Sequence, residues 1–576
     1  MPIMKIYFLS VFILGSFVAT AQKKSFPVVG PGLEVDPYHY SVTKASQFSH
    51  ACVASAHPLA SMVGAAMMKR GGNAFDAAIA TQLVLAVVYP NAGNLGGGGF
   101  LLARKADGAL MAIDFREKAP SKASRDMYLD KNGEAQTKLS QNGHLASGVP
   151  GTVAGLMATF KHAKLSLPEL VQPAIEIAKH GFVITKAEAR GLNSNKTAFL
   201  SYNTRPVVFV RNVEWHEGDT LVQENLAATL SRISENGARG FYGGQTARLI
   251  LKEMKRGGGI ISKSDLKQYT VAERTPISAN YKGYEVVGFP PPSSGGILLL
   301  QMLKMVEHRN IEAKGFLSLA SVQLMVEVER RAFADRAEHL GDPDFWKVPV
   351  KSLLNEDYLK LRMNDYDSLK AGNSNLISAG VPRESEQTTH LNVADSEGNV
   401  LSSTTTLNGA YGSHTVVGGA GFLLNNEMDD FSIKPGVPNK FGALGGAANA
   451  IAPGKRMLSS MCPVIVLKDG QPFIVIGTPG GTTIPTSIFQ GLLNMLDFSL
   501  STQDAINAPK FHHQWKPDEV LVEKSFPALL QKELSSMGYK VTERIPIGRT
   551  EVIKMGKGKM MEAVADKRGD DSVSGF

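Results

Sequence analysis

The hydrophobic pattern of the chain changes near residue 388, and this change limits which folds the sequence can adopt. Helical periodicity dominates from about Pro150 to Leu369 and is interrupted by a strand-like stretch at Tyr284–Gly288. From Thr388 onward, short alternating strands are separated by glycine turns such as Asp469-Gly470. Because helices dominate one part and strands joined by tight turns the other, we predict an α+β fold with helices packed on antiparallel sheets.

Two helices and a glycine-rich loop are predicted near the start of the chain. Apolar residues recur at helical spacing from Pro58 to Arg70, and a second, largely apolar helix is expected from about Asn73 to Tyr89. The loop Asn91–Phe100 follows a helix and leads into a strand, which is the reverse of the order in a phosphate-binding loop. We therefore expect its glycines to mark a close approach of backbones or of a small ligand, and not a nucleotide site.

The composition excludes several classes of protein. With 43% hydrophobic and 20% charged residues among 576, the chain matches a globular protein and not a disordered, collagen-like or polytopic membrane protein. The formal net charge of +8 is spread along the chain without a block of five basic residues, so a nucleic-acid partner is not expected.

The first 21 residues have the pattern of a secretory signal peptide. A positively charged start is followed by the uncharged stretch Ile6–Val18 and by Ala19-Thr20-Ala21, which matches an A-x-A cleavage site. The apolar stretch is short for a membrane span, and an N-terminal anchor is the weaker alternative. We expect residues 1–21 to be removed and the chain to be exported, to the periplasm or as a secreted protein, without a stable membrane anchor.

Cys52 and Cys462 are the two cysteines of the chain. Neither lies in a C-x-x-C motif, so no chemical role is expected for either thiol. Buried free thiols are the preferred interpretation, and a single disulfide between them is the alternative.

A threonine-rich hairpin follows the change in pattern. The strand that begins at Thr388 turns at Ser396–Asn399 and returns as Val400–Asn408, so Thr404 or Thr406 is expected to face Thr388. Threonines in strands by themselves indicate only β-propensity.

A threonine at a chain terminus can supply both a nucleophile and a base. Its hydroxyl needs a base, and a free α-amine with a pKa of about 7.7 to 8.0 can serve as one. Cleavage of the Gln387–Thr388 bond, by attack of the Thr388 hydroxyl on the preceding carbonyl, would create this terminus at the point where the hydrophobic pattern changes.

Several motifs, taken together, resemble those of the γ-glutamyltranspeptidases, and they cover nearly the whole mature chain. They are Gly93–Phe100, Asp114–Pro120, Gln387–His390, Thr404–Asn408, Leu424–Ser432, Leu458–Met461, Thr478–Gly481 and Asn507–Trp515. The resemblance implies an N-terminal nucleophile hydrolase, which is a four-layer αββα sandwich. It also implies a precursor that cleaves itself into a large subunit, 22–387, and a small subunit, 388–576, which remain one folded unit.

The resemblance implies catalytic roles for four residues. Thr388 would be the nucleophile and the new N-terminus, and Thr406 would hold its hydroxyl. The backbone N–H groups of Gly480 and Gly481 would form the oxyanion hole. Loss of one such donor typically costs about a hundredfold or more in rate.

The implied substrate pocket matches the two charges of a γ-glutamyl group. Such a group ends in a free α-carboxylate and a free α-ammonium, so a selective pocket needs one fixed cation and at least one anion. The residues that the resemblance assigns are Arg116, Ser459 and Ser460 for the carboxylate, and Asn408, Glu427 and Asp430 for the ammonium.

The implied reaction is γ-glutamyl transfer through a covalent intermediate on Thr388. Glutathione and related γ-glutamyl amides would be the donors, and water, amino acids or dipeptides the acceptors. No cofactor or metal is required. The adjacent His512 and His513 have no third ligand at a useful spacing and are expected to be core or hydrogen-bonded residues, like His390. The loop 435–446 corresponds to the family's lid, and Phe441 stands where some bacterial members have a tyrosine.

Two alternatives remain open at this stage. An acylase of the same fold, as in cephalosporin acylases, would act on glutaryl side chains, which lack the α-ammonium. An exported amino-acid-binding protein that never cleaves itself is a different class. A Ser-His-Asp hydrolase is disfavoured because no G-x-S-x-G motif is found.

Overall fold

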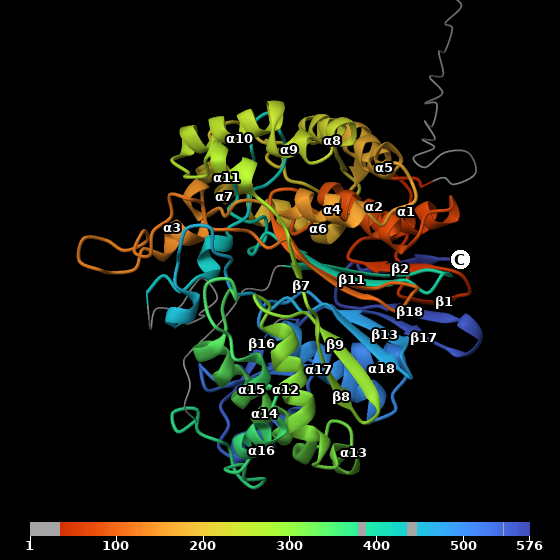
Figure 1. The fold of residues 1–576 in the computed structure, drawn as a ribbon, viewed down its shortest axis with the longest axis vertical. Coiled ribbons are helices and arrows are strands. Elements are labelled where there is room, and N and C mark those ends of the chain that lie inside the picture. The colour runs from red at the N-terminus through yellow and green to blue at the C-terminus, as the bar shows by residue number, and fades with distance from the viewer. Residues whose placement is uncertain (1–34, 378–387, 435–445, 545) are drawn as a thin grey trace, which may run out of the picture.

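Two antiparallel seven-stranded sheets lie at the centre of the molecule (Figure 1). The structure is a computed structural model that describes residues 35–377, 388–434, 446–544 and 546–576. The predicted signal peptide, residues 1–21, lies outside these ranges, as do Gln387 and Phe441.

Each sheet is a continuous antiparallel ladder. The first sheet has the order β1 (Ala45–Phe48), β18 (Met561–Ala565), β17 (Glu551–Met555), β13 (Gln471–Gly477), β12 (Val464–Lys468), β9 (Tyr284–Gly288) and β8 (Ile277–Tyr281). The second has the order β19 (Ser572–Gly575), β2 (Cys52–Ser55), β10 (Thr388–Ala394), β11 (Val400–Thr406), β3 (Gly98–Arg104), β4 (Leu110–Asp114) and β7 (Ala272–Arg274). Smaller sheets pair β5 (Phe182–Val183) with β6 (Thr220–Leu221), and β15 (Val520–Glu523) with β14 (Phe511–His512) and β16 (Val541–Arg544).

Helices cover the outer face of each sheet, and the result is the four-layer αββα sandwich that was predicted (Figure 1). On the side of the second sheet lie α1 (Pro58–Lys69), α2 (Ala74–Val88), α4 (Thr152–Phe160), α5 (Leu167–His180), α6 (Lys186–Ser194), α7 (Lys196–Tyr202), α8 (Glu224–Asn236), α9 (Arg239–Tyr242), α10 (Gly244–Gly257) and α11 (Lys263–Gln268). On the side of the first lie α12 (Gly295–Glu307), α13 (Ile311–Lys314), α14 (Leu319–His339), α15 (Val350–Leu353), α16 (Glu356–Arg362), α17 (Thr483–Leu496), α18 (Thr502–Asn507) and α19 (Ala528–Ser536). The short helix α3 (Thr137–Gln141) lies beside the 3₁₀-helix η2 (Glu427–Asp430).

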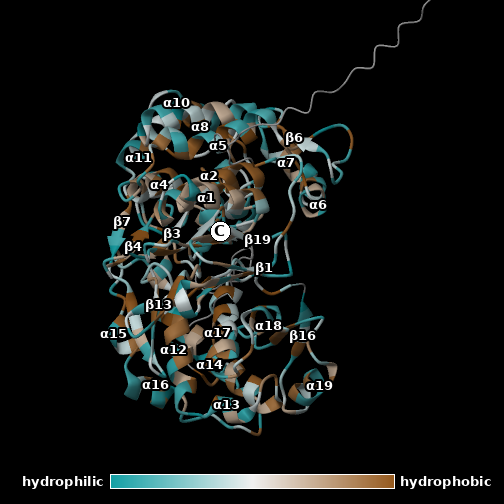
Figure 2. Ribbon diagram, turned by 90° about the vertical axis from the view of Figure 1, so that its right-hand side faces the viewer, coloured by the Kyte–Doolittle hydropathy of each residue, from teal (hydrophilic) through white to brown (hydrophobic). Residues whose placement is uncertain are grey.

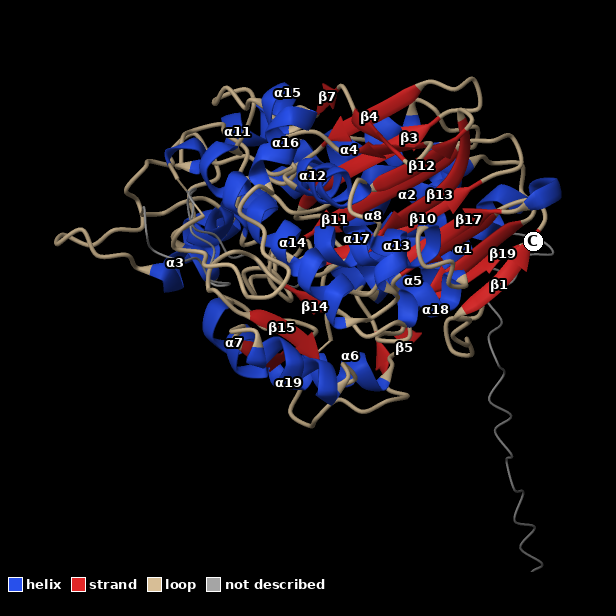
Figure 3. Cartoon of the chain, turned by 90° about the horizontal axis from the view of Figure 1, so that it is seen from below, coloured by secondary structure: helices blue, strands red, loops and turns tan. Residues whose placement is uncertain are grey.

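Hydrophobic side chains fill the spaces between these layers. One buried cluster joins the second sheet to α1, α2, α5 and α8, and another joins both sheets to α12, α14 and α17. Figure 2 shows the inner helices α2 and α12 largely in the hydrophobic colour and the outer helices α11 and α16 largely in the hydrophilic one. Seen from below, strands of the two sheets lie over one another in similar directions (Figure 3). The two sheets therefore pack face to face in the middle of the sandwich.

Most local predictions are confirmed. The first helix is α1, and the second is α2, whose N-terminus is capped by Asn73 together with Asp76. The turn at Asp469-Gly470 joins β12 to β13, and the threonine-rich hairpin is β10–β11. Cys52 and Cys462 are buried free thiols, as preferred, and no disulfide joins them. The short helix α18 was not predicted.

Each sheet contains strands from before and from after residue 387, paired with one another. In the second sheet, β10 and β11 lie between β2 and β3, and β19 pairs with the other edge of β2. In the first sheet, β1 and the pair β8–β9 flank four strands that come from residues 464 to 565. A chain broken between residues 387 and 388 would therefore still be joined by the backbone hydrogen bonds of both sheets.

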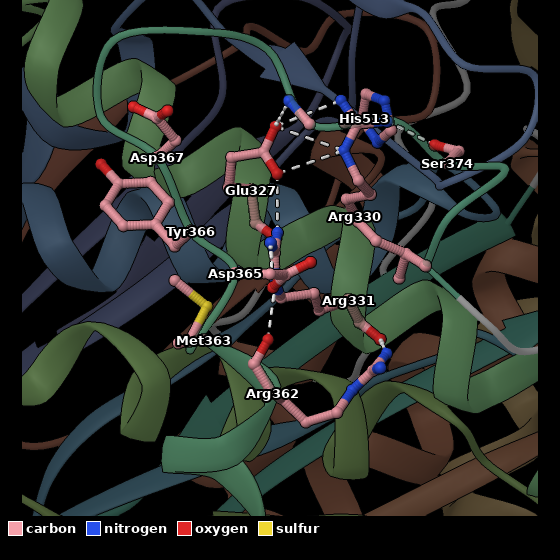
Figure 4. Close-up of polar contacts among 12 residues, drawn as sticks. Glu327, Arg330, Arg331, Arg362, Met363, Asp365, Tyr366, Asp367, Ser374 and His513 are labelled. Atoms are coloured by element: carbon pink, nitrogen blue, oxygen red, sulfur yellow. Dashed lines mark hydrogen bonds and ion pairs between the residues drawn. The ribbon is translucent and has the colours of Figure 1, made fainter.

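Buried charges on α14 tie the segment 371–377 to the C-terminal part of the chain. Figure 4 shows Glu327 between Arg330 and Arg331, and both arginines form ion pairs with it. Arg330 also pairs with Asp518 and donates to the hydroxyl of Ser374, whose backbone N–H donates to Asp518 Oδ2 at 2.8 Å. The segment that precedes residue 378 is thereby fixed by side chains from both parts of the chain.

Within the described residues, no helix combines the length and apolar character that crossing a membrane requires.

His390 is a buried, neutral histidine between the sheets. Its Nε2 lies 2.9 Å from Asn392 Oδ1, which only accepts, so Nε2 donates and Nδ1 accepts from the Thr404 hydroxyl at 2.9 Å. Burial lowers the pKa of His390 to about 4. The expected hydrogen-bonded role is confirmed for this residue.

We predict that His390 makes the protein less stable in mild acid. An unfolded histidine has a pKa of about 6.5, so the unfolded chain binds the extra proton first as the pH falls. The stabilisation is fully present above pH 6.5 and is lost between about pH 6.5 and pH 4, by up to about 3 kcal/mol. His390→Gln should lower the Tm at pH 7 but reduce the further fall between pH 7 and pH 4.5. The exposed His39→Gln is the control. Equal pH slopes for His390→Gln and the wild type would contradict the prediction.

Candidate active site

One row of residues across the second sheet contains both the predicted nucleophile, Thr388, and the residue predicted to bind the substrate carboxylate, Arg116. Thr388 pairs with Thr406 across β10 and β11, and Thr406 pairs with Gly98 of β3. Arg116 follows the end of β4 by two residues and lies level with Gly98, because Phe100 pairs with Asp114. Three strand spacings place Thr388 and Arg116 about 14 Å apart along this row. The sheet register thus sets the distance between the two groups.

Thr388 lies at the start of a strand that, within the described residues, is paired on one side only at this point. Strand β2 pairs with residues Leu391–Ala394 of β10, whereas β11 pairs with the whole strand. Thr406, and not Thr404, is the residue opposite Thr388, and its hydroxyl oxygen accepts the N–H of Asn408 at 2.7 Å. Of the two threonines predicted to face Thr388, the structure selects Thr406.

The side chain of Thr388 is directed towards the first sheet. Alternate residues of a strand share a face, so Thr388 points to the same side as His390. The ring of His390 lies against Gly477, where a Cβ would be only 2.1 Å from the ring. The chain continues from Gly477 into the loop Thr478–Gly481, and this loop and the start of β10 therefore lie at the same end of the two sheets.

The two glycines of this loop carry buried backbone amides at the start of α17. Gly480 and Gly481 have φ angles of 140° and 60°, which side-chain-bearing residues rarely adopt. Their carbonyls accept from Thr483 and Ile484, whereas no group in the described part of the chain accepts from their own N–H groups. Buried N–H groups normally have partners, and the N-terminus of a helix favours negative charge. The loop can therefore stabilise an oxyanion.

Arg116 is the centre of a buried charge cluster. Its side chain is 1% exposed, and its guanidinium lies 2.5 Å from Glu427 Oε2 and 2.5 Å from Asp430 Oδ2. It also donates to the carbonyl of Leu458 at 3.2 Å. Burial disfavours its charge, but the neighbouring carboxylates outweigh burial and raise the pKa of Arg116. Burial raises the pKa values of Glu427 and Asp430, and Arg116 opposes this effect.

The other predicted substrate residues border this cluster. Asn408 has a left-handed φ of 72° and donates from Nδ2 to the carbonyl of Asn426, next to Glu427. The hydroxyl of Ser459 accepts the N–H of Met461 at 3.2 Å. Ser460 accepts from Arg336 at 3.5 Å. The six predicted substrate residues thus come from four separate stretches of sequence and lie in or beside the charge cluster around Arg116.

Three further residues near this cluster were not found from the sequence. Asn449 donates to the carbonyl of Asp430 at 2.7 Å and accepts the N–H of Leu458 at 3.0 Å, so it joins two parts of the site. Glu117 is fully buried beside Arg116, and burial raises its pKa. Arg336 is buried behind Ser460. Only Glu117 had a local signal, since it lies within the motif Asp114–Pro120.

The ring nitrogens of the adjacent histidines His512 and His513 lie within hydrogen-bond distance of neighbouring side chains. His512 Nε2 lies 2.9 Å from Gln514 Oε1, and its Nδ1 lies 2.9 Å from the Thr486 hydroxyl. His513 Nε2 lies 3.2 Å from Asp518 Oδ1. Both histidines are buried, hydrogen-bonded residues of the core, as expected.

The glycine-rich loop allows the backbones around Thr406 to approach closely. A Cβ on Gly97 would lie 2.0 Å from the carbonyl oxygen of Thr406, and one on Gly99 would lie 2.3 Å from that of Thr404. On Gly93 and Gly96, it would lie 2.1 Å from the carbonyls of Leu85 and Leu423. The predicted close approach of backbones is confirmed.

Comparison with known proteins agrees with this geometry. The family model described as gamma-glutamyltranspeptidase matches residues 60–576. The chain belongs to the γ-glutamyltranspeptidase family. It is 46% identical over 568 residues to the glutathione hydrolase proenzyme of Escherichia coli K12, which covers 98% of this chain and 97% of that protein.

Solved structures show the same fold. The cephalosporin acylase from Bacillus halodurans superposes with a TM-score of 0.82 at 27% identity, over 94% of this chain and 98% of that one. The γ-glutamyltranspeptidase of Helicobacter pylori superposes with a TM-score of 0.56 at 44% identity, over 57% of this chain and 94% of that one. This γ-glutamyltranspeptidase family member is an N-terminal nucleophile hydrolase in fold, as the motifs implied.

We predict that Gly97→Ala disrupts the site through the backbone of Thr406. Relief of the 2.0 Å contact requires β3 and β11 to separate at this point, and overpacking of this kind costs about 1 to 3 kcal/mol. The variant should show a lower Tm and lower activity. Gly491→Ala, in α17, is the matched control, because its new Cβ would meet neighbours at ordinary contact distances of 3.5 and 3.6 Å. Wild-type Tm and activity in Gly97→Ala would refute this account of the glycine loop.

Proposed function

We propose that this chain is an exported, periplasmic or secreted γ-glutamyltransferase and glutathione hydrolase that cleaves itself between Gln387 and Thr388. The large subunit, 22–387, and the small subunit, 388–576, would remain one folded unit. The enzyme would transfer the γ-glutamyl group of glutathione and related amides to water, amino acids or dipeptides. The observation that carries this proposal is the register that aligns Thr388 with Thr406 and, across Gly98, with Arg116.

The position of Thr388 supports a role as an N-terminal nucleophile. It is the first residue of β10, and its strand is held by β11 along its whole length. Because strands from both proposed subunits are paired within each sheet, cleavage would free the α-amine without loss of the fold. The side of β10 that faces away from β11 at Thr388 has no partner strand in the described part of the chain.

The chemistry needs no group beyond those of this chain. The α-amine of Thr388 takes the hydroxyl proton as the oxygen attacks the γ-carbonyl carbon of the donor. Collapse of the tetrahedral intermediate breaks the carbon–nitrogen bond, and the ammonium returns the proton to the leaving amine. Water or an acceptor amine then attacks the carbonyl carbon of the γ-glutamyl ester and gives a proton to the α-amine of Thr388. The carbon–oxygen bond to Thr388 breaks, and the ammonium passes that proton to the threonine oxygen, which restores the hydroxyl.

The loop at Gly480 and Gly481 supports oxyanion stabilisation in both steps. Its two buried amides lie at the N-terminus of α17 and belong to the sheet end that contains Thr388. Negative charge that develops on the carbonyl oxygen would find donors already in place, which is the main source of rate in such sites. Thr406 would hold the attacking hydroxyl from the neighbouring strand.

The buried charge cluster supports recognition of both ends of a γ-glutamyl group. Arg116 already binds carboxylates, those of Glu427 and Asp430, at 2.5 Å. A donor's α-carboxylate would take its place on the guanidinium, with Ser459 and Ser460, while its α-ammonium would bind Asp430, Glu427 and Asn408. This exchange keeps every charge paired in a region where unpaired charges are costly.

An acylase acting on glutaryl groups is the second candidate. One solved structure that resembles this chain over 94% of its length is named a cephalosporin acylase. A glutaryl group has no α-ammonium, and the two acids beside Arg116 would then have no cation to bind in the substrate. The cluster therefore favours γ-glutamyl donors over glutaryl donors.

We predict that Thr388→Ala remains a single full-length chain. Wild-type protein should give two bands on a denaturing gel, for the segments 22–387 and 388–576. Thr389→Val is the matched control, because this buried neighbour lies on the opposite face of β10 and its hydroxyl has no partner in the described structure. It should cleave normally. Active wild-type protein with an unbroken chain would disprove the mechanism, as would two bands from Thr388→Ala.

We predict that Asp430→Ala weakens binding of donors with an α-ammonium. Loss of a hydrogen bond to a charged group costs about 1.5 to 3 kcal/mol, so kcat/KM for a γ-glutamyl anilide should fall about tenfold to a hundredfold, mainly through KM. Turnover of a glutaryl anilide should not fall. Asp429→Asn is the control, because Asp429 bonds the Ser140 hydroxyl instead of Arg116. A preference for the glutaryl anilide in the wild type would favour the acylase.

A further inference from the structure

A second arginine, Arg336, lies behind the serine pair of the proposed substrate pocket. It belongs to the last turns of α14 and is 2% exposed. Its Nε donates to the hydroxyl of Ser294 at 2.9 Å, and its Nη2 makes a long hydrogen bond of 3.5 Å to the hydroxyl of Ser460. The guanidinium therefore contacts one serine of the pocket directly.

The loop Pro290–Gly296 connects the same guanidinium to the other serine. Both the backbone N–H and the hydroxyl of Ser294 donate to the carbonyl of Ser459, at 2.7 and 2.9 Å. The N–H of Ser459 in turn donates to the carbonyl of Pro292 at 3.0 Å. Arg336 and this loop precede residue 387, whereas the serine pair follows it. The serine pair is thus positioned from the proposed large subunit.

Hydrogen bonds received by the hydroxyls of Ser459 and Ser460 determine where these hydroxyls can donate their own protons. A guanidinium has only donors, so the oxygen of Ser460 must accept from Arg336. The oxygen of Ser459 accepts the N–H of Met461 in the same way. Each hydroxyl has one proton, which is then directed to another acceptor. A substrate carboxylate, which only accepts, fits two hydroxyls that have been turned into donors.

The charge of Arg336 acts on the same region. Burial lowers the pKa of Arg336 to about 10, and nearby Asp430 opposes this effect, so the group is still cationic at neutral pH. Together with Arg116, it gives the pocket two buried cations around Asp430. A bound donor adds a carboxylate to this region, and a second cation offsets its charge.

We propose that Arg336 is a positioning residue that orients Ser460 directly and Ser459 through Ser294, and that it selects donors with a free α-carboxylate. This inference rests on the proposed function, since it refines the pocket for γ-glutamyl donors. Arg336 acts only on recognition of the α-carboxylate. The α-ammonium and the γ-carbonyl of the donor are bound by other residues.

The test compares two donors that differ only in this carboxylate. The γ-glutamyl anilide has it, and the 4-aminobutyryl anilide lacks it. In Arg336→Met, kcat/KM for the γ-glutamyl anilide should fall about tenfold to a hundredfold, while that for the 4-aminobutyryl anilide should change less than about threefold. In a Ser460→Ala background, Arg336→Met should have a much smaller further effect on the γ-glutamyl anilide. Ser294→Ala should shift the donor ratio in the same direction by about twofold to tenfold.

Arg331→Met is the matched control for loss of a buried arginine from the same helix. Arg331 pairs with Glu327 and Asp365 away from the pocket (Figure 4), so this variant should lower stability without a change in the donor ratio. A denaturing gel for the two bands checks that each variant has matured.

Equal losses on both donors in Arg336→Met would overturn the inference, because a purely structural role affects both alike. If Arg336→Met does not mature, an unchanged donor ratio in Ser294→Ala overturns it instead. A wild-type protein that turns over neither donor would refute the proposed function and not the role of Arg336 alone.

Discussion

The backbone ladder that joins β10, β11 and β3 is the constraint on which the candidate site depends. It places Thr388, Thr406 and Gly98 in one row, with Arg116 level with them beyond the end of β4. Register in a sheet is all or none, because a slip of one residue turns every side chain to the other face. The ladder therefore holds the predicted nucleophile Thr388, the neighbouring hydroxyl of Thr406 and the predicted carboxylate-binding residue Arg116 in one arrangement. No contact between these side chains is required.

The same ladder explains how a chain with a break before Thr388 can keep its fold. Strands β10 and β11 lie in the interior of their sheet, between β2 and β3, and their removal would leave two unpaired edges in the core. Buried polar contacts between the sheets add to this, such as the bond from Asn392 to the carbonyl of Glu551 at 2.8 Å. The cluster around Glu327 and Arg330 holds residues 371–377 against Asp518 and Trp515 in the same manner.

Buried charge is concentrated where the proposed substrate is charged. Isolated charges in a protein interior are strongly unfavourable, and Arg116 is tolerated because Glu427 and Asp430 neutralise it. A hydrophobic cluster of equal volume would be at least as stable, so stability alone does not account for these residues. Under the proposed function, a zwitterionic ligand would explain their arrangement, because its two charges can exchange with those of the cluster. The serine pair, held by its supporting loop, would add neutral hydroxyl groups that donate hydrogen bonds to the carboxylate of such a ligand.

Local sequence determined the elements, and motifs supplied most residues of the candidate site. The helices α1 and α2, the hairpin β10–β11 and the turn at Asp469-Gly470 follow from periodicity, capping and turn residues, which act over a few positions. The hairpin pattern alone could not choose between Thr404 and Thr406, because both lie on the same face of one strand. The family resemblance implied Thr406, and the register places that residue opposite Thr388. Asn449, Arg336 and the loop at Ser294 could not be found in this way, since their partners lie far away in sequence and their local patterns are those of ordinary loops and helices. Which buried polar groups meet depends on how whole sheets and helices pack, and only the tertiary structure decides that.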